Sequence, residues 1–126
     1  MLELGPRIAI VEDDALVRKA LVRLLETAYC VADYASATSL LSAINHRPPQ
    51  CLIADLQMPI MTGFELLCHL NRAGIFIPTI IITAYDEPGT RAMCIAGGVS
   101  AYLLKPVRRA VLMKTVNELL QSERGL

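Results

Sequence analysis

Four short runs of apolar residues, each followed at once by a polar or charged side chain, constrain the fold of this chain most strongly. The runs are continuous rather than alternating, which indicates strands buried on both faces, as in a parallel sheet covered by helices. They span residues 8–11, 51–54, 79–82 and 101–104, and they are followed by Glu12-Asp13-Asp14, Asp55, Thr83 and Lys105. The sequence therefore predicts an α/β fold with chemically active groups at the carboxyl ends of its strands.

Helical patterns lie between these runs. Asp14 is placed to cap a helix over residues 15–28, on which Arg18, Lys19 and Arg23 are expected to face solvent. Thr62 and Glu65 form a capping box that opens a helix ending at residues 73–74. Further helices are predicted over residues 36–45, from Pro88 in a first turn to residues 97–98, and over residues 107–121, with a weak strand at 31–35.

Five strands that alternate with five helices predict a three-layer α/β sandwich built from right-handed crossovers. The spacing leaves the strand order open. A doubly wound order of 2-1-3-4-5 would place the ends of the first and third strands side by side at the centre of the sheet.

Length and composition narrow the class of protein. With 126 residues we expect a single domain over residues 1–126, with a loosely held tail at 121–126. The 12 basic and 12 acidic residues cancel, so no overall field favours nucleic acid. No apolar run approaches the roughly 18 residues of a membrane span, and the first residues do not resemble a secretory signal, so we expect a cytoplasmic protein. Its four separated cysteines are expected to be free core thiols.

Three carboxylates would meet at one edge of a parallel sheet: Glu12, Asp13 and Asp55. Such a group repels itself, which raises the pKa of at least one member unless a cation neutralises the cluster. Oxygen ligands with no Cys or His nearby favour Mg²⁺, or Mn²⁺ in its place, over Zn²⁺. The cluster therefore predicts a divalent-cation site with room for a phosphorylated ligand.

Asp55 is the best candidate nucleophile, because a carboxylate can attack a phosphoryl group to give an acyl phosphate. Lys105 and Thr83 would hold the phosphoryl oxygens beside the metal ion. Each residue also has a simpler interpretation, since an acid after a strand is often a helix cap and a lone Thr or Lys is often a strand former or a solvated cation. Their occurrence at the same end of successive strands favours a site that transfers phosphate to itself.

Four motifs occur in order at suitable spacing: Ile10-Val11-Glu12-Asp13-Asp14, Ile53-Ala54-Asp55-Leu56-Gln57-Met58-Pro59 with Gly63, Ile82-Thr83-Ala84, and Ala101-Tyr102-Leu103-Leu104-Lys105-Pro106. Together they resemble a response-regulator receiver domain of two-component signalling, over roughly residues 7–120. The resemblance implies a CheY-like, flavodoxin-like fold of order 2-1-3-4-5, with Asp55 accepting phosphate from a histidine kinase. It also implies that Lys105 and Thr83 hold the phosphoryl group. The implied ligands of Mg²⁺ are Glu12, Asp13, Asp55 and the backbone carbonyl of Gln57.

The resemblance further implies a switch in which Tyr102 turns inward when Thr83 moves toward the phosphate. The surface of the fourth helix, fifth strand and fifth helix would then change its affinity for a partner, which includes a second copy of the chain. The alternative for Tyr102 is an edge-strand aromatic with its hydroxyl in water.

The resemblance also implies a cis peptide bond before Pro106. Segments 83–87 and 96–98 look most like regulators that carry a LuxR-type DNA-binding domain, although direct contact of this chain with nucleic acid or membrane is not expected.

Three rival classes use some of the same residues. A phosphohydrolase of the haloacid-dehalogenase type needs a second Asp as acid/base where this chain has Gln57. A degenerate receiver would lack site residues that are all present here. A nucleotide-binding flavodoxin-like domain needs a Gly-rich or Ser/Thr-rich phosphate loop after the first strand, where Glu12 and Asp13 would repel phosphate. We therefore expect a signalling phosphoacceptor that catalyses only its own phosphotransfer and slow dephosphorylation. The kinase, the output, the oligomeric state and whether the receiver stands alone are left open.

Overall fold

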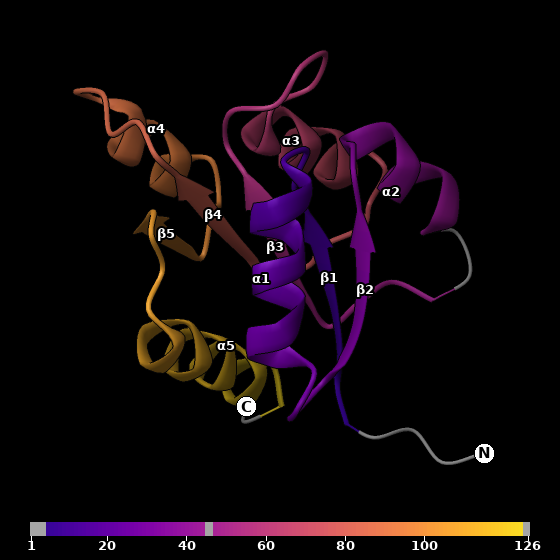
Figure 1. Cartoon of the computed structure of the whole chain (residues 1–126). Coiled ribbons are helices and arrows are strands. Elements are labelled where there is room, and N and C mark those ends of the chain that lie inside the picture. The colour runs from indigo at the N-terminus through magenta and orange to yellow at the C-terminus, as the bar shows by residue number, and fades with distance from the viewer. Residues whose placement is uncertain (1–4, 45–46, 125–126) are drawn as a thin grey trace.

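A sheet of five parallel strands forms the centre of the protein in a computed structural model that describes residues 5–44 and 47–124. The strands are β1 (Arg7–Val11), β2 (Cys30–Tyr34), β3 (Cys51–Asp55), β4 (Thr79–Thr83) and β5 (Ala101–Leu104). Their order across the sheet is β2-β1-β3-β4-β5 (Figure 1). Every residue of β3 and β4 is buried, as continuous apolar runs predict. The predicted α/β sandwich and the strand order that the resemblance implied are both confirmed.

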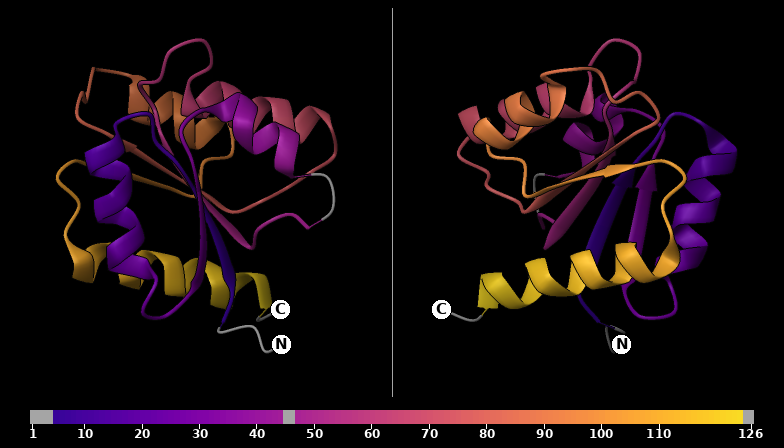
Figure 2. Two further views of the ribbon diagram at one scale, coloured as in Figure 1. Left: turned by 45° about the vertical axis from the view of Figure 1, so that its right-hand side comes forward. Right: turned by 90° about the vertical axis from the view of Figure 1, so that its left-hand side faces the viewer.

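Five helices cover the two faces of the sheet (Figures 1 and 2). One face carries α1 (Ala15–Leu25) and α5 (Arg109–Arg124), and the other carries α2 (Ala37–Ala43), α3 (Gly63–Arg72) and α4 (Thr90–Ala96). Asp14 caps α1 by accepting hydrogen bonds from two backbone N–H groups, and Thr62 and Glu65 form the predicted capping box of α3. Among the described residues, no helix has the length and apolar character that a membrane crossing requires.

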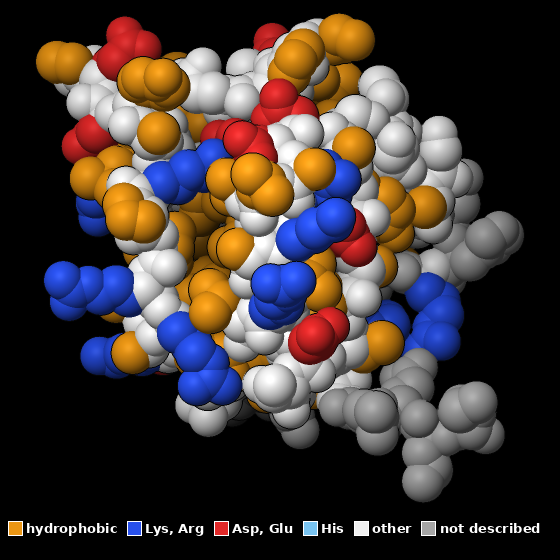
Figure 3. All heavy atoms as spheres, viewed as in Figure 1, with side chains coloured by type: hydrophobic (Ala, Val, Ile, Leu, Met, Phe, Trp, Pro, Cys, Tyr) orange, Lys and Arg blue, Asp and Glu red, His pale blue; other side chains and the backbone are white. Residues whose placement is uncertain are grey.

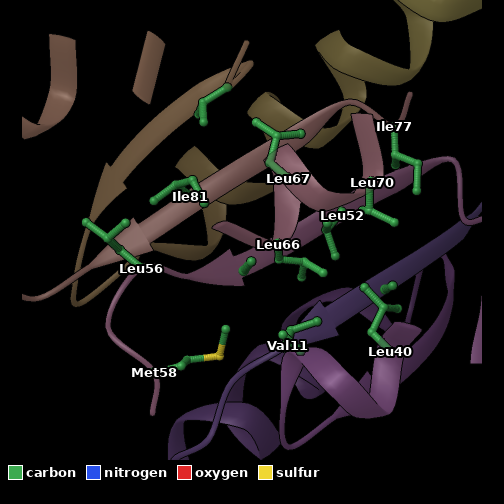
Figure 4. Close-up of a cluster of buried hydrophobic side chains, with 14 of the residues drawn as sticks. Val11, Leu40, Leu52, Leu56, Met58, Leu66, Leu67, Leu70, Ile77 and Ile81 are labelled. Carbon is green, nitrogen blue, oxygen red and sulfur yellow. The ribbon is translucent and has the colours of Figure 1, made fainter. Parts of the chain in front are cut away.

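Two apolar cores, one on each face, hold the helices on the sheet. In β1, Ile8 and Ile10 belong to the core beneath α1 and α5, whereas Ala9 and Val11 belong to the core beneath α2, α3 and α4. This is the two-residue alternation of a strand whose two faces are both covered. Figure 4 shows the second core, where leucines of α2 and α3 pack against the sheet. Burying one such side chain contributes about 1.5–3 kcal/mol to the stability of the fold. A shift of register by one residue would expose these side chains, so the two cores fix the register of the strands.

The starts of α4 and α5 differ most from those that the sequence predicted. Gly89 caps α4 with a left-handed φ of 85°, so Pro88 precedes the helix instead of lying in its first turn. The last helix begins at Arg109 instead of residue 107 and continues to Arg124, so residues 121–124 of the expected tail are helical. The predicted end of the second helix at Asn45 lies outside the described residues, as do residues 1–4 and 125–126.

The four cysteines are free, but they are not all core thiols. Cys51 and Cys94 are buried as expected, whereas Cys68 is half-buried and Cys30 is exposed. Cys30 begins β2, which is an edge strand with only partial cover. The expectation of a core thiol was therefore wrong at this position, because a run of apolar neighbours does not reveal that a strand lies at the sheet edge.

The start of α3 lies directly against the end of β3 at Gly63. A side-chain carbon placed on Gly63 would lie 2.5 Å from the backbone oxygen of Asp55 and 3.0 Å from Cδ1 of Ile81. The Gly63 N–H also donates a hydrogen bond to the carbonyl of Leu56, at 3.3 Å. Glycine at this position therefore allows α3 to approach the peptide that carries Asp55.

Replacing Gly63 with alanine is expected to lower the free energy of unfolding by about 2–3 kcal/mol, because the new methyl group would overlap backbone atoms that cannot rotate away. Urea unfolding followed by circular dichroism measures this loss, since the chain has no tryptophan. The control is Gly97→Ala, whose new methyl group would meet the Phe64 ring. That ring can turn aside, so we expect a loss below about 1 kcal/mol. Equal losses in the two variants would contradict the proposed backbone overlap.

Candidate functional site

Carboxylates from two neighbouring strands meet at one edge of the sheet. Glu12 and Asp13 directly follow β1, and Asp55 ends β3, which pairs with β1 in parallel register. One oxygen from each of the three carboxylates lies within 4.8 Å of the others. Glu12 is fully buried and Asp55 is 4% exposed, whereas Asp13 is exposed. The sheet topology thus assembles the three acids that the sequence analysis grouped together.

Lys105 brings a positive charge to this cluster from the end of β5. Its Nζ donates to Glu12 Oε1 at 2.7 Å and to Asp55 Oδ2 at 3.0 Å. The Lys105–Pro106 peptide bond is cis, as the resemblance implied. Burial by itself would lower the pKa of Lys105, but its hydrogen bonds to Glu12 and Asp55 raise it above the ordinary value. Lys105 therefore remains a cation between two carboxylates.

Burial has the opposite effect on Glu12. Desolvation raises the pKa of its carboxyl to about 7, although the hydrogen bonds from Lys105 and from the Asp14 N–H act to lower it. The nearby Asp55 also raises the pKa of Glu12 by repulsion. The cluster therefore holds more negative charge than one lysine stabilises, and a divalent cation would favour the charged form of Glu12.

The remaining contacts of Asp55 orient its carboxylate. Oδ1 accepts a hydrogen bond of 3.0 Å from the backbone N–H of Gln57, while Oδ2 faces Lys105. Asp55 and Lys105 line a cleft together with other residues of the strand ends: Glu12, Asp13, Asp14, Gln57, Ala84 and Tyr85. Figure 3 shows the face on which acidic side chains gather near one end of α1, above a hollow lined by apolar side chains. The two oxygens of Asp55 are thus held at the floor of an acidic cleft.

Thr83 lies at the end of β4, beside β3, and its side chain is fully buried. Its hydroxyl accepts a hydrogen bond from the backbone N–H of Tyr85 at 3.1 Å and donates to the Tyr85 carbonyl at 3.2 Å. The Lys105 backbone N–H in turn donates to the Thr83 carbonyl. The hydroxyl would have to release the Tyr85 carbonyl before it could donate a hydrogen bond to another acceptor.

Tyr102 points inward from the edge strand β5. It is 3% exposed, and its hydroxyl donates to Asp86 Oδ1 at 3.1 Å. The guanidinium carbon of Arg91 lies 5.5 Å from the centre of the ring, close enough for a cation–π contact. The alternative of a hydroxyl in water is therefore wrong for this structure. Neither Asp86 nor Arg91 was singled out from the sequence, because their contacts cross from the β4–α4 loop and α4 to β5.

The prediction for Arg18 is wrong. This residue was expected to face solvent on α1, but its side chain is only 18% exposed. Nη1 donates to the backbone carbonyl of Glu12 at 2.7 Å, and Nε donates to Asp33 Oδ2 at 3.1 Å. The helical pattern could not reveal this, because the partner carboxylate lies on β2 and the side chain folds back toward the start of the helix.

The donor set fits a hard divalent cation. The three clustered carboxylates provide oxygen ligands only, and no Cys or His belongs to the group found among the described residues. Oxygen ligands suit Mg²⁺ and Mn²⁺ rather than Zn²⁺. The arrangement could hold such an ion between Asp13 and Asp55 while Lys105 faces the same cleft.

Residues 8–117 match the family described as the response regulator receiver domain. The chain belongs to this family. The receiver is 32% identical over 114 residues to an uncharacterized 14.6 kDa protein of Leptolyngbya boryana, with 88% of this chain and 87% of that protein covered. It is 30% identical over 108 residues to the transcriptional regulatory protein FixJ of Azorhizobium caulinodans, with 85% of this chain and 51% of FixJ covered. Its structure matches that of a LuxR-family DNA-binding response regulator from Staphylococcus aureus with a TM-score of 0.84 and 29% identity. The match covers 91% of this chain and 98% of that chain.

These relatives define the general role of the receiver. Response regulator receivers belong to two-component signalling, in which they pair with histidine kinases. Transcription regulation fits relatives such as FixJ. The receiver spans about half the length of FixJ and of the MprA response regulators that it also matches.

Proposed function

We propose that this receiver accepts a phosphoryl group from a histidine kinase onto Asp55. The observation that carries the proposal is the position of the Asp55 carboxylate, 3.0 Å from the Lys105 ammonium at the end of a buried parallel strand. In the transfer, an Asp55 oxygen attacks phosphorus and forms a P–O bond. The P–N bond to the donor histidine breaks, and its electron pair stays on the imidazole nitrogen. Lys105 faces the cleft, where it balances charge on the phosphoryl oxygens.

The proposed cation is Mg²⁺, with Mn²⁺ able to replace it. Glu12, Asp13, Asp55 and the backbone carbonyl of Gln57 would hold the ion, which supplies positive charge opposite the phosphoryl oxygens. Residues of the chain itself position the Asp55 carboxylate. Lys105 already bridges Glu12 and Asp55, and the Gln57 N–H fixes the second oxygen of Asp55. This arrangement positions the acceptor before the donor arrives.

Phosphorylation of Asp55 would change the preferred partner of the Thr83 hydroxyl from the Tyr85 backbone to a phosphoryl oxygen. That exchange would alter the β4–α4 loop, which also carries Asp86, the partner of the Tyr102 hydroxyl. Tyr102 is already buried while the Thr83 hydroxyl contacts the Tyr85 backbone, so the expected order, in which Tyr102 turns inward only when Thr83 moves, does not apply to this structure. Thr83 and Tyr102 would act as the switch through the contact of Tyr102 with Asp86. Because the two arrangements differ by the exchange of one hydrogen bond of the Thr83 hydroxyl, a single dianion could shift the balance between them.

The output surface would be formed by α4, β5 and α5, and its proposed occupant is a second copy of the receiver. Each of these elements carries a large apolar side chain that is partly exposed, including Ile95, Leu104 and Val111. Burying such side chains favours association. Sedimentation velocity should therefore show a larger dimer fraction after treatment with acetyl phosphate and Mg²⁺. A Leu104→Glu variant should remain monomeric under the same conditions, and a dimer fraction equal to that of the treated wild type would contradict this surface.

The role as a phosphoacceptor also makes the cytoplasm the proposed location, which agrees with four free cysteines among the described residues. In this proposal the receiver is not an enzyme with a separate substrate. It catalyses transfer to its own carboxylate and the slow loss of the same group, and this chain makes no direct contact with nucleic acid.

Removal of the metal tests the proposal directly. With acetyl phosphate and Mg²⁺, the intact mass of the protein is expected to increase by one phosphoryl group, whereas excess chelator should prevent the increase. The physical reason is that the acidic cleft repels a phosphate donor unless a cation neutralises it. An adduct of equal yield with chelator would argue against a metal-dependent transfer.

A further inference from the structure

We infer that Arg18 is a positioning residue that orients the Asp13 carboxylate for the divalent cation. The inference rests on the proposed function. Arg18 does not face the acidic cleft, and it would act through the backbone of the loop that joins β1 to α1. Its relevant contact is the 2.7 Å hydrogen bond from Nη1 to the carbonyl oxygen of Glu12.

Every polar group of Glu12, in the backbone and in the side chain, makes a hydrogen bond. Its N–H donates to the carbonyl of Tyr34 at 3.0 Å, and its carbonyl accepts from Arg18. Its carboxylate accepts from the Asp14 N–H at 3.1 Å and from Lys105 at 2.7 Å. Glu12 is also completely buried. The residue before Asp13 therefore has a fixed orientation.

Asp13 differs from both of its acidic neighbours. It is exposed, and within the described part of the chain its carboxylate makes no hydrogen bond or ion pair. Asp14, by comparison, uses its carboxylate to cap α1. The direction of the Cα–Cβ bond of Asp13, from which its carboxylate projects, is thus set by the backbone on its two sides.

The two peptide groups that flank Asp13 are fixed by different contacts. The peptide between Glu12 and Asp13 is planar, so the bond from Arg18 to its oxygen also orients the N–H and Cα of Asp13. The peptide between Asp13 and Asp14 is held by the Asp14 N–H, which donates to Glu12 Oε2. Removing Arg18 would free the first of these peptides and leave the second in place.

Asp33 on β2 holds Arg18 in the required orientation. Its Oδ2 accepts from Arg18 Nε at 3.1 Å, while Nη1 of the same guanidinium reaches Glu12. Arginine can donate from separate nitrogens of a rigid plane, whereas lysine has a single ammonium on a flexible stem. The pair is more than a surface ion pair, because the Arg18 side chain is 18% exposed and one of its bonds goes to the backbone of the acidic loop.

Charge and positioning predict opposite effects of removing Arg18. As a cation near three carboxylates, Arg18 should weaken the binding of another cation, so a purely electrostatic role predicts tighter binding in Arg18→Met. As a positioning residue it should strengthen binding, because loss of contacts behind metal ligands typically costs about 10–100-fold in affinity. The sign of the change therefore separates the two explanations.

The experiment is a titration of the full chain with Mn²⁺ followed by electron paramagnetic resonance, which reports free Mn²⁺ without any phosphotransfer. We expect the dissociation constant to rise about tenfold in Arg18→Met and to rise several-fold in Arg18→Lys, which keeps the charge. Lys19→Met is the matched control, because it removes one charge from the next, exposed position of α1. Thermal unfolding by circular dichroism establishes that each variant is folded at the titration temperature.

Tighter binding in Arg18→Met, or an unchanged dissociation constant in both Arg18 variants, would overturn the positioning role alone. A wild-type protein that binds no Mn²⁺ would overturn the proposed metal site and this inference with it. If Arg18→Met does not fold, Arg18→Lys decides: weaker binding supports the inference and wild-type binding overturns it.

Discussion

Asp55→Asn is expected to abolish phosphorylation of this receiver. The amide is similar in size to the carboxylate, but its oxygen carries no full negative charge and is a poor nucleophile toward phosphorus. With acetyl phosphate and Mg²⁺, intact-mass measurement should show the phosphoryl adduct on the wild type and none on the variant. Glu12 is not expected to replace Asp55 as acceptor, because Lys105 and the Asp14 N–H hold its buried carboxylate.

The matched control is Glu118→Gln, which makes the same carboxylate-to-amide change at an exposed position of α5. It should be phosphorylated to the wild-type extent. An adduct that survives in Asp55→Asn would mean that phosphate enters at another side chain, and the assignment of Asp55 as acceptor would have to be withdrawn. Absence of the adduct in the wild type as well would favour a receiver that binds partners without phosphorylation.

Lys105→Met is expected to slow phosphotransfer by about 10²–10³-fold, which is the typical effect of removing one positioned charge or donor from a site where negative charge develops. The methionine retains the length and apolar character of the lysine stem, so the change is chiefly loss of the ammonium that bridges Glu12 and Asp55. The rate is measured from the time course of the mass increase with acetyl phosphate and saturating Mg²⁺.

Metal binding provides the discriminating control for Lys105→Met. Removing a cation from between two carboxylates should maintain or strengthen the affinity for Mn²⁺, so slow transfer would accompany intact metal binding. Lys114→Met, at an exposed position of α5, should transfer at the wild-type rate. A Lys105→Met variant that transfers as fast as wild type would remove Lys105 from the proposed mechanism, whereas loss of Mn²⁺ binding would indicate collapse of the cleft.

Local sequence signals were sufficient for the α/β fold class, whereas the strand order 2-1-3-4-5 was implied by the family resemblance. Continuous apolar runs identified β1, β3, β4 and β5, and in β3 and β4, which are covered on both faces, every position is buried. Thr62 and Glu65 marked the start of α3 through a motif whose hydrogen bonds join residues three apart. Where the local signals were weaker, at the starts of α4 and α5, the predicted boundaries were displaced. A glycine with positive φ at residue 89 separates Pro88 from the helix that it was expected to open.

The candidate site was predicted as a set of residues but not as a set of contacts. Glu12, Asp13, Asp55 and Lys105 could be grouped because parallel strands bring their carboxyl ends to the same edge. The roles assigned to them remain predictions until the phosphorylation and metal-binding experiments are done. The bridge that Lys105 makes between Glu12 and Asp55 joins residues 93 and 50 positions apart, and no spacing rule specifies such a geometry.

The amino-acid sequence by itself determined the succession of strands and helices along the chain, the caps of α1 and α3, and the kind of chemical group at each strand end, because these depend on neighbours along the chain. Only the tertiary structure decided which of these groups touch. It turned the Thr83 hydroxyl toward the backbone of Tyr85, buried Tyr102 against Asp86, and folded Arg18 back onto the Glu12 carbonyl. Such contacts depend on how helices and strands pack in space, where a side chain finds partners that are distant in the sequence.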